Sequence, residues 1–392
     1  MERSRSAFPD WAHLPPLVLH WISDRVKSIT DYVRFRAVCS PWRSASLPKP
    51  RHLPPQLPWL MFPWDSQDEE DDGIRLFYDH WESKTHKIHL PDTIGMMCRG
   101  SYRGWLFLDS QQEGAEVFLL NPLTRARIQL PSFTAADNES DEADIDIIKV
   151  TFSTELSDPD CLIIAFPLVR SSTFCCRVGD PCWTKVLFYA IPDVFPDGTY
   201  YNERFYVLCL GVMHVVDTNK PGDMIVYDFR REIRCANVFL QGEKSGVYVV
   251  AFFGQKEQDE ATAQKDEDDQ AAHDNKGTTE TTPKLKIELY QFIEQPLELK
   301  KITNTSDTAL FFTDYYYCLA VCSDDWDSLD GGSVYIQSKH VPSTDTDGDI
   351  TCYNIFSGKL NDFKYERVAS EVTKKPSFGP RPPAMWFQPS FV

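Results

Sequence analysis

Cysteine side chains are the first groups in this sequence that could carry chemistry. Cys175 and Cys176 with Cys182, and Cys318 with Cys322, bring thiols close together along the chain. Thiolates are typical zinc ligands, but zinc sites usually supply them as paired Cys-x-x-Cys elements, and neither group has that spacing. We therefore predict no metal site, and we interpret these cysteines as small apolar side chains of strands.

Histidine and acidic residues lead to the same prediction. His86 and His89 flank Ile88 without a carboxylate partner that sequence can locate, so we interpret them as exposed strand residues. Acidic residues gather at 68–72 and 137–146, but they lack the alternating ligands and glycine of an EF-hand loop and read as solvated loops. The Gly-x-Ser-x-Gly motif, the phosphate-binding glycine loop and the dinucleotide fingerprint are absent as well. We predict a protein that is not an enzyme and uses no cofactor.

Composition limits the partners and the compartment. The 392 residues include 58 acidic and 40 basic side chains, which gives a net charge of −18. Such a surface repels phosphate groups, so we expect neither nucleic acid nor membrane as a partner. No apolar run reaches the roughly 18 to 20 residues of a membrane span, and no signal peptide follows Met1. We expect a location in the cytoplasm, the nucleus or both.

The elements that would position functional residues change in character along the chain. Up to residue 48 the sequence favours three short helices. Pro15 and Pro16 suit the start of the first helix, Thr30 suits the cap of the second, and Ser40-Pro41 suits the start of the third. The apolar face of the first helix would consist of Val18, Leu19, Ile22 and Val26.

From about residue 74, short runs of β-branched and aromatic residues recur at roughly 10-residue spacing, which indicates an antiparallel sandwich, barrel or propeller. Three segments, around Asn121, Asp228 and Asn354, share a strand, an Asn or Asp, a turn and a second strand. This weak repeat favours a propeller of six or seven blades. Residues 256–282 contain no large apolar side chain and are expected to form a disordered loop.

The predicted organisation therefore has three parts. A small all-α domain at 8–48 precedes a Pro-rich and acidic linker at 49–73. A large all-β domain follows at 74–392, predicted as a six- or seven-bladed β-propeller with a disordered acidic insert at 256–282.

The N-terminal motif resembles the plant F-box. The resemblance lies in Leu14-Pro15, the pair Val18-Leu19, Ile22 and the string DYVRFRAVCSPWRS at 31–44. Leu17 stands where an acidic residue is common, and Pro41 where a lysine is common. An F-box is implied to bind the small Skp-type adaptor of a cullin–RING ligase. The residues expected at that interface, or in its immediate support, are Leu14, Pro15, Leu19, Ile22, Phe35, Val38, Cys39 and Trp42.

Physical size agrees with this implication. A segment below about 40 residues lacks the volume to bury its own apolar side chains, so these helices need an outside surface. The surface could belong to a partner, which would cover on the order of 800 Å² on each side. The alternative is that the helices simply pack on the β domain.

The rest of the chain resembles the plant F-box family with a KIB-type β-propeller. The recognisable positions are Gly104-Trp105, Asn121-Pro122-Leu123-Thr124, Leu130-Pro131, and Trp386 with Pro389-Ser390 in the tail. Asn-Pro-Leu-Thr also occurs in kelch-type F-box proteins. The resemblance implies that the propeller recruits a protein target for ubiquitination, and it does not name the target.

Tyr315, Tyr316 and Tyr317 are candidates for contact with that target, because aromatic side chains contribute much of the energy of protein interfaces. Packing within the sheet is the favoured alternative for them. Trp64, Trp81 and Trp183 are weighed in the same way, with packing between blades as the main interpretation.

Three functions follow from these patterns. The leading hypothesis is a substrate-recognition subunit of a Skp–cullin–F-box ubiquitin ligase. The second is a non-degradative scaffold, for example a propeller that masks a kinase. The third, a propeller-fold hydrolase, would need clustered histidine and acidic side chains in a central channel.

Overall fold

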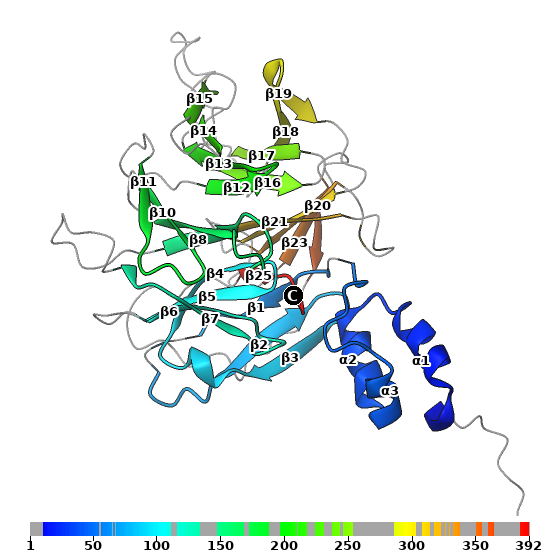
Figure 1. The fold of residues 1–392 in the computed structure, drawn as a ribbon. Coiled ribbons are helices and arrows are strands. Elements are labelled where there is room, and N and C mark those ends of the chain that lie inside the picture. The colour runs from blue at the N-terminus through cyan, green and yellow to red at the C-terminus, as the bar shows by residue number, and fades with distance from the viewer. Residues whose placement is uncertain are drawn as a thin grey trace, which may run out of the picture.

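Three short helices lie at one side of a ring of β-sheets (Figure 1). The structure is a computed structural model. It describes residues 11–391 except 55, 65, 67, 111–115, 134–146, 168–171, 188–196, 210, 218–223, 231–236, 244–245, 254–285, 303–307, 314–316, 323–325, 327–328, 330–331, 338–349, 355–359 and 364–384. The predicted insert at 256–282 therefore lies outside the described residues.

The predicted helices are confirmed, with one change of boundary. They are the 3-10 turn η1 (Trp11–His13), α1 (Pro16–Ser23), α2 (Ile29–Ala37) and α3 (Ser40–Ser44). The N-cap of α2 is Ser28, whose hydroxyl accepts the N–H of Asp31 at 3.4 Å, and not Thr30 as predicted. The earlier start places Ile29 in the first turn of α2, where its side chain is buried.

The strands of the described residues form six sheets, and in each of them the strand order below runs from the innermost strand outward. The first sheet has β25 (Met385–Phe387), β1 (Trp59–Met61), β2 (Ile74–Asp79) and β3 (Lys84–His89). The second has β4 (Met97–Tyr102), β5 (Trp105–Asp109), β6 (Val117–Leu120) and β7 (Arg127–Leu130). The third has β8 (Ile147–Phe152), β9 (Leu162–Pro167), β10 (Ser172–Arg177) and β11 (Thr184–Leu187).

The remaining three sheets follow in chain order. The fourth has β12 (Asp197–Tyr201), β13 (Arg204–Cys209), β14 (Val212–Asp217) and β15 (Met224–Asp228). The fifth has β16 (Asn237–Glu243), β17 (Gly246–Phe253), β18 (Lys286–Glu294) and β19 (Leu297–Ile302). The sixth has β21 (Tyr317–Cys322), β20 (Thr308–Thr313), β22 (Ser333–Gln337), β23 (Ile350–Asn354) and β24 (Leu360–Phe363).

The innermost strands contact one another in a cycle. β25 contacts β4, and the contacts continue through β8, β12, β16 and β21 back to β25. Radial sheets arranged in this way are the architecture of a β-propeller. The predicted all-β propeller is therefore confirmed as the fold.

The ring closes through the two ends of the described chain. Strand β25 pairs antiparallel with β1 in the register Trp59↔Phe387, Leu60↔Trp386 and Met61↔Met385. The Trp386 side chain is fully buried, and its indole N–H donates to the carbonyl of Phe312 in the sixth sheet at 2.8 Å. One residue thus ties the first sheet to the last.

This closure corrects a predicted boundary. β1 lies inside the segment 49–73 that we predicted as a linker, yet it pairs with β2 as well as β25. The ring therefore begins by Trp59 rather than at residue 74. The prolines around β1 favoured the prediction of a linker. The strand has only three residues, which is too short for an alternating pattern to be visible.

Three family-typical positions meet beside the closure. Gly104, in the hairpin between β4 and β5, has a φ of +82°, and a Cβ on it would lie 2.5 Å from the Cβ of Ser390. The amide of Asn121 donates to the Ser390 carbonyl at 3.0 Å, while its Oδ1 accepts the N–H groups of Leu123 and Thr124. Asn121 thus caps its turn, as predicted, and also holds the tail.

The tryptophans weighed as packing residues lie between neighbouring sheets. Trp183 stacks on Phe133 at 4.7 Å within a core shared by the second and third sheets. Trp81 contacts Phe311 of the sixth sheet, and Trp64 donates its indole N–H to the Met96 carbonyl at 2.9 Å. These contacts support the packing interpretation.

Gly104→Ala tests the close approach of the tail. We expect the free energy of unfolding to fall by roughly 2–4 kcal/mol, because positive φ strain adds to overlap with Ser390. Gly179→Ala is the control, since Gly179 has a φ of +93° but nothing within 4 Å of its Cβ position. Urea denaturation measures both variants, and equal losses would show that the tail contact contributes nothing.

Candidate docking surface on the N-terminal helices

The N-terminal helices have a small interior. Leu19, Tyr32 and Phe35 are buried, and the Phe35 ring packs on Trp42 with centroids 4.6 Å apart. The Tyr32 hydroxyl donates to the Leu47 carbonyl at 2.9 Å, which fixes the chain that leaves α3. These contacts hold three short helices in one arrangement.

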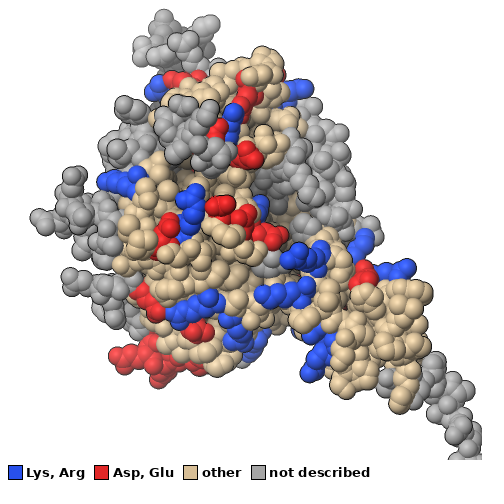
Figure 2. Space-filling view, viewed as in Figure 1, with Lys and Arg blue, Asp and Glu red and all other residues tan. Residues whose placement is uncertain are grey.

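The outer surface of the same segment is unusually apolar. Six of the twelve large apolar side chains that are exposed among the described residues lie between residues 11 and 47. They are Trp11, Leu17, Trp21, Val33, Val38 and Leu47. The lobe at the lower right of Figure 2, where Figure 1 places the helices, is mostly tan, so few charged side chains interrupt it. Concentrated exposed apolar surface of this kind marks an interaction site.

The predicted adaptor-facing residues divide into two groups. Pro15 and Val38 are exposed and are available to a partner. Leu19 and Phe35 are buried inside the helices, where they can only support the surface. Half-buried positions are held by Leu14, Ile22, Cys39 and Trp42.

Sequence reasoning missed most of the exposed apolar side chains. Leu17 and Trp21 are four residues apart on α1 and therefore share a helix face, which lies outside. The i, i+4 spacing of these two residues is visible in the sequence. However, α1 has two apolar faces, and spacing alone does not show which of them is buried. Leu17, where the plant F-box commonly has an acidic residue, is 59% exposed and makes the outer face more apolar.

The helices also pack on the ring, which was the alternative to partner binding. Ile29 is 3% exposed and belongs to the same apolar core as Trp59 and Phe77 of the first sheet. Packing on the ring therefore uses the start of α2 and leaves the six exposed side chains uncovered.

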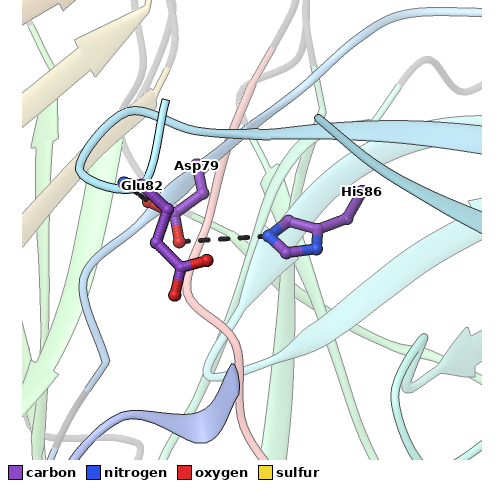
Figure 3. Close-up of side chains that lie close together, drawn as sticks. All are labelled: Asp79, Glu82 and His86. Carbon is purple, nitrogen blue, oxygen red and sulfur yellow. Dashed lines mark hydrogen bonds and ion pairs between the residues drawn. The ribbon is translucent and has the colours of Figure 1, made fainter. Parts of the chain in front are cut away.

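A second cluster lies at the turn between β2 and β3. Asp79, Glu82 and His86 place one donor atom each within 4.8 Å of one another (Figure 3). Hairpin pairing aligns Phe77 with His86 and Asp79 with Lys84, so Asp79 and His86 are diagonal neighbours. The interpretation of His86 as an exposed histidine was wrong: its side chain is 16% exposed and its ring stacks on Trp59 at 4.4 Å.

The carboxylates of this cluster are already engaged by the fold. Asp79 Oδ1 accepts the N–H groups of Trp81 and Glu82, and Oδ2 accepts the indole N–H of Trp59 at 3.0 Å. Glu82 pairs with Arg34 of α2 at 3.0 Å. The cluster therefore caps the hairpin and joins it to the helices, and the absence of a metal site stays a prediction.

Protonation of Asp79 is also controlled by these contacts. Burial by itself would raise the pKa of the carboxyl, but His86 and the N–H groups of Glu82 and Trp81 outweigh burial and lower the pKa below its ordinary value. Asp79 consequently stays ionised at neutral pH and keeps its role as an acceptor.

The buried strand cysteines fit the apolar interpretation, but Cys182 does not, because it is exposed in a bend that precedes β11. Cys98, Cys161 and Cys176 are buried, and Cys176 follows Cys175 directly in β10, so their side chains point to opposite faces. Burial raises the pKa of the Cys98 thiol to about 12, which makes it inert. The side chains of Cys318 and Cys322 lie outside the described residues.

The role of the three tyrosines in target contact stays a prediction. Tyr315 and Tyr316 lie outside the described residues, and Tyr317 is the first residue of β21, paired with Thr313. In the part of the chain that is described, no helix is long and apolar enough to cross a membrane.

Asp79→Asn tests the role of the cap. We expect a loss of roughly 1–2 kcal/mol in the free energy of unfolding at pH 7, because the amide cannot accept every bond of the carboxylate. The lowered pKa gives stability that is present above about pH 4 and lost as pH falls through the folded value, so the gap to wild type should be smaller at pH 3 than at pH 7. Asp160→Asn, on an exposed turn, is the control. An equal gap at both pH values would contradict this account.

Known proteins are similar to this chain in sequence. The family model of the KIB1-4 beta-propeller matches residues 77–354, which is more than half of the chain. F-box protein SKIP23 of Arabidopsis thaliana is 23% identical over 398 residues and covers 90% of each chain. F-box protein KIB3 of the same organism is 33% identical over 115 residues, 29% of this chain and 25% of that protein.

Other similarities are shorter or weaker. The chain spans 35% of the length of two further Arabidopsis F-box proteins to which it is 31% identical. The beta-propeller domain of Cps50 (Swd1) from Myceliophteria thermophila matches with a TM-score of 0.36 and 9% identity over 74% of this chain and 79% of that one. The family match decides the assignment: the chain belongs to the KIB1-4 beta-propeller family, as a plant F-box protein whose helices precede a KIB-type propeller.

Proposed function

We propose that this protein is the substrate-recognition subunit of a Skp–cullin–F-box ubiquitin ligase. Its helices bind the Skp-type adaptor and, through it, a cullin–RING ligase, while the propeller binds a protein target in the cytoplasm or nucleus. The protein itself performs no bond chemistry. Its contribution is effective concentration, because a target held on the ring stays near the ubiquitin-loaded enzyme at the other end of the complex.

The observation that carries this proposal is the exposed apolar surface of the helices. Ile29, Tyr32 and Phe35 are already buried, so the helices do not need a partner to stay folded. The exposed Trp21, Val38 and their neighbours are instead available for a partner's surface. Tryptophan is among the residues that most often dominate the energy of protein interfaces.

Val38→Glu tests adaptor binding. Val38 is 57% exposed, so the change should leave the free protein stable. A charge buried against the adaptor should weaken binding at least about tenfold, because an unpaired buried charge is costly. Titration of the purified adaptor, followed by calorimetry, measures the affinity, and the double variant Leu14→Ala/Pro15→Ala should weaken it as well.

Val226→Glu provides the matched control. Val226 is 48% exposed on β15, in the fourth sheet of the ring, and its substitution should not change the affinity. Adaptor binding by Val38→Glu at wild-type strength, or no binding by wild type, would refute the docking proposal.

Target handling separates this proposal from a non-degradative scaffold. Proximity labelling with the intact chain and with Val38→Glu should recover the same targets, while ligase subunits disappear from the variant. Targets of the intact chain should increase when the proteasome is inhibited. Targets whose abundance does not respond would favour a scaffold that masks its partner.

A further inference from the structure

We propose that Gln56 is a positioning residue that fixes the F-box helices against the propeller, so that the adaptor and the target are held at one defined angle. This role rests on the proposed ligase function. Its basis is the set of contacts that Gln56 makes from within the segment that was predicted to be a Pro-rich linker.

The Gln56 side chain is buried and uses both ends of its amide. Its Oε1 accepts the N–H of Ile29 at 2.6 Å, and its Nε2 donates to the carbonyls of Lys27 and Pro54 at 2.9 and 2.7 Å. Only 5% of the residue is exposed. Gln56 therefore holds the end of the α1–α2 turn that leads into α2.

The bond to Ile29 satisfies a specific need of the helix. The first amides of an α-helix have no partner within the helix, and Ile29 is the first residue of α2. A group outside the helix must accept this N–H because Ile29 is buried. Gln56 supplies that acceptor from the chain that leads directly into β1.

The same residue reaches the C-terminal tail through its backbone. Gln388, which follows β25, donates its side-chain amide to the Gln56 carbonyl at 3.1 Å. Three residues further on, the ring of Phe391 lies 6.3 Å from that of Tyr32 in α2. Helix, linker and tail thus meet at one point, although they are far apart in sequence.

A second attachment restricts rotation about this point. Arg34, five residues after Ile29 on α2, pairs with Asp31 at 2.9 Å and with Glu82 of the β2–β3 turn at 3.0 Å. Glu82 is in turn held by the Asp79 cap. Two contacts about 7 Å apart along one helix fix an orientation that a single contact would leave open.

An orientation matters for a ligase because ubiquitin transfer is a geometric event. The lysine amine must reach the thioester between ubiquitin and its carrier enzyme, where an isopeptide bond forms and the enzyme thiol leaves. A fixed angle between the helices and the ring restricts the set of lysines that reach the thioester. A variable angle would let many different lysines reach it at different times.

The test uses the full chain with Gln56→Ala. Hydrogen–deuterium exchange should become roughly tenfold faster in peptides covering residues 26–34, because the bonds that hold the α1–α2 turn are lost. Peptides of the fourth and fifth sheets should be unchanged, which verifies that the ring is folded. Gln129→Ala, on the exposed face of β7, is the matched control and should show no change.

The functional readout is the pattern of ubiquitin on the protein itself in a reconstituted ligase. Wild type should be modified on a small set of propeller lysines, and Gln56→Ala should bind the adaptor equally well but spread the modification over at least twice as many. Gln388→Ala removes only the hydrogen bond from the tail and should give a smaller change in the same direction. This variant replaces Gln56→Ala in the test if Gln56→Ala does not fold.

The outcomes distinguish the two proposals. Unchanged exchange at 26–34, or an unchanged lysine pattern despite faster exchange, would overturn the positioning role of Gln56. Failure of wild type to bind the adaptor would instead overturn the ligase function, and the exchange experiment would then still decide whether Gln56 fixes the helices.

Discussion

Strand β25 pairs with β1, and the residues that follow it continue to the N-terminal helices. The ring closes through this pairing, and Trp386 extends it to the sixth sheet. Ser390 depends on it for its contacts with Gly104 and Asn121. The position of α2 depends on it as well, because Gln56 precedes β1 and Phe391 follows β25 at the same end of this ladder. One short ladder therefore supports both the ring, the proposed target-binding part, and the helices, the proposed adaptor-binding part.

Polar and apolar contacts have separate roles around the helices. Apolar packing of Ile29 gives adhesion to the ring, but such packing is non-directional and would tolerate several angles. The hydrogen bonds of Gln56 and the Arg34–Glu82 pair are directional, and they select one angle. Exposed ion pairs contribute little to stability, so Arg34 is better understood as a constraint on orientation than as a source of affinity.

The helices and strands could be predicted from the sequence, but the residues that they contact in the folded chain could not. Prolines and apolar spacing indicated the helices, but the competing pair Leu17 and Trp21 gave no sign of lying outside. The repeat around Asn121 and Asp228 identified side chains that cap turns. However, Asn121 follows the third strand of its sheet, whereas Asp228 is the last residue of the fourth. Asp79 is the residue that corresponds to Asn121, and it escaped notice because its turn lacks the Asn-Pro signature. Gln56 acts through residues 27–29 and 388, and no local pattern records such distant partners.

Because the chain is synthesised from its N-terminus, the ring can close only late in synthesis. The ribosome makes α1, α2 and β1 early, and it makes β25 only after the rest of the ring. At roughly 5–20 residues per second, the delay between β1 and β25 is on the order of tens of seconds. During that interval the nascent helices can already carry Trp21 and Val38 on their surface, while Gln388 and Phe391 do not yet exist to secure them. A truncated chain that ends before β25 would remain in this early condition, with its helices present and the ring unclosed.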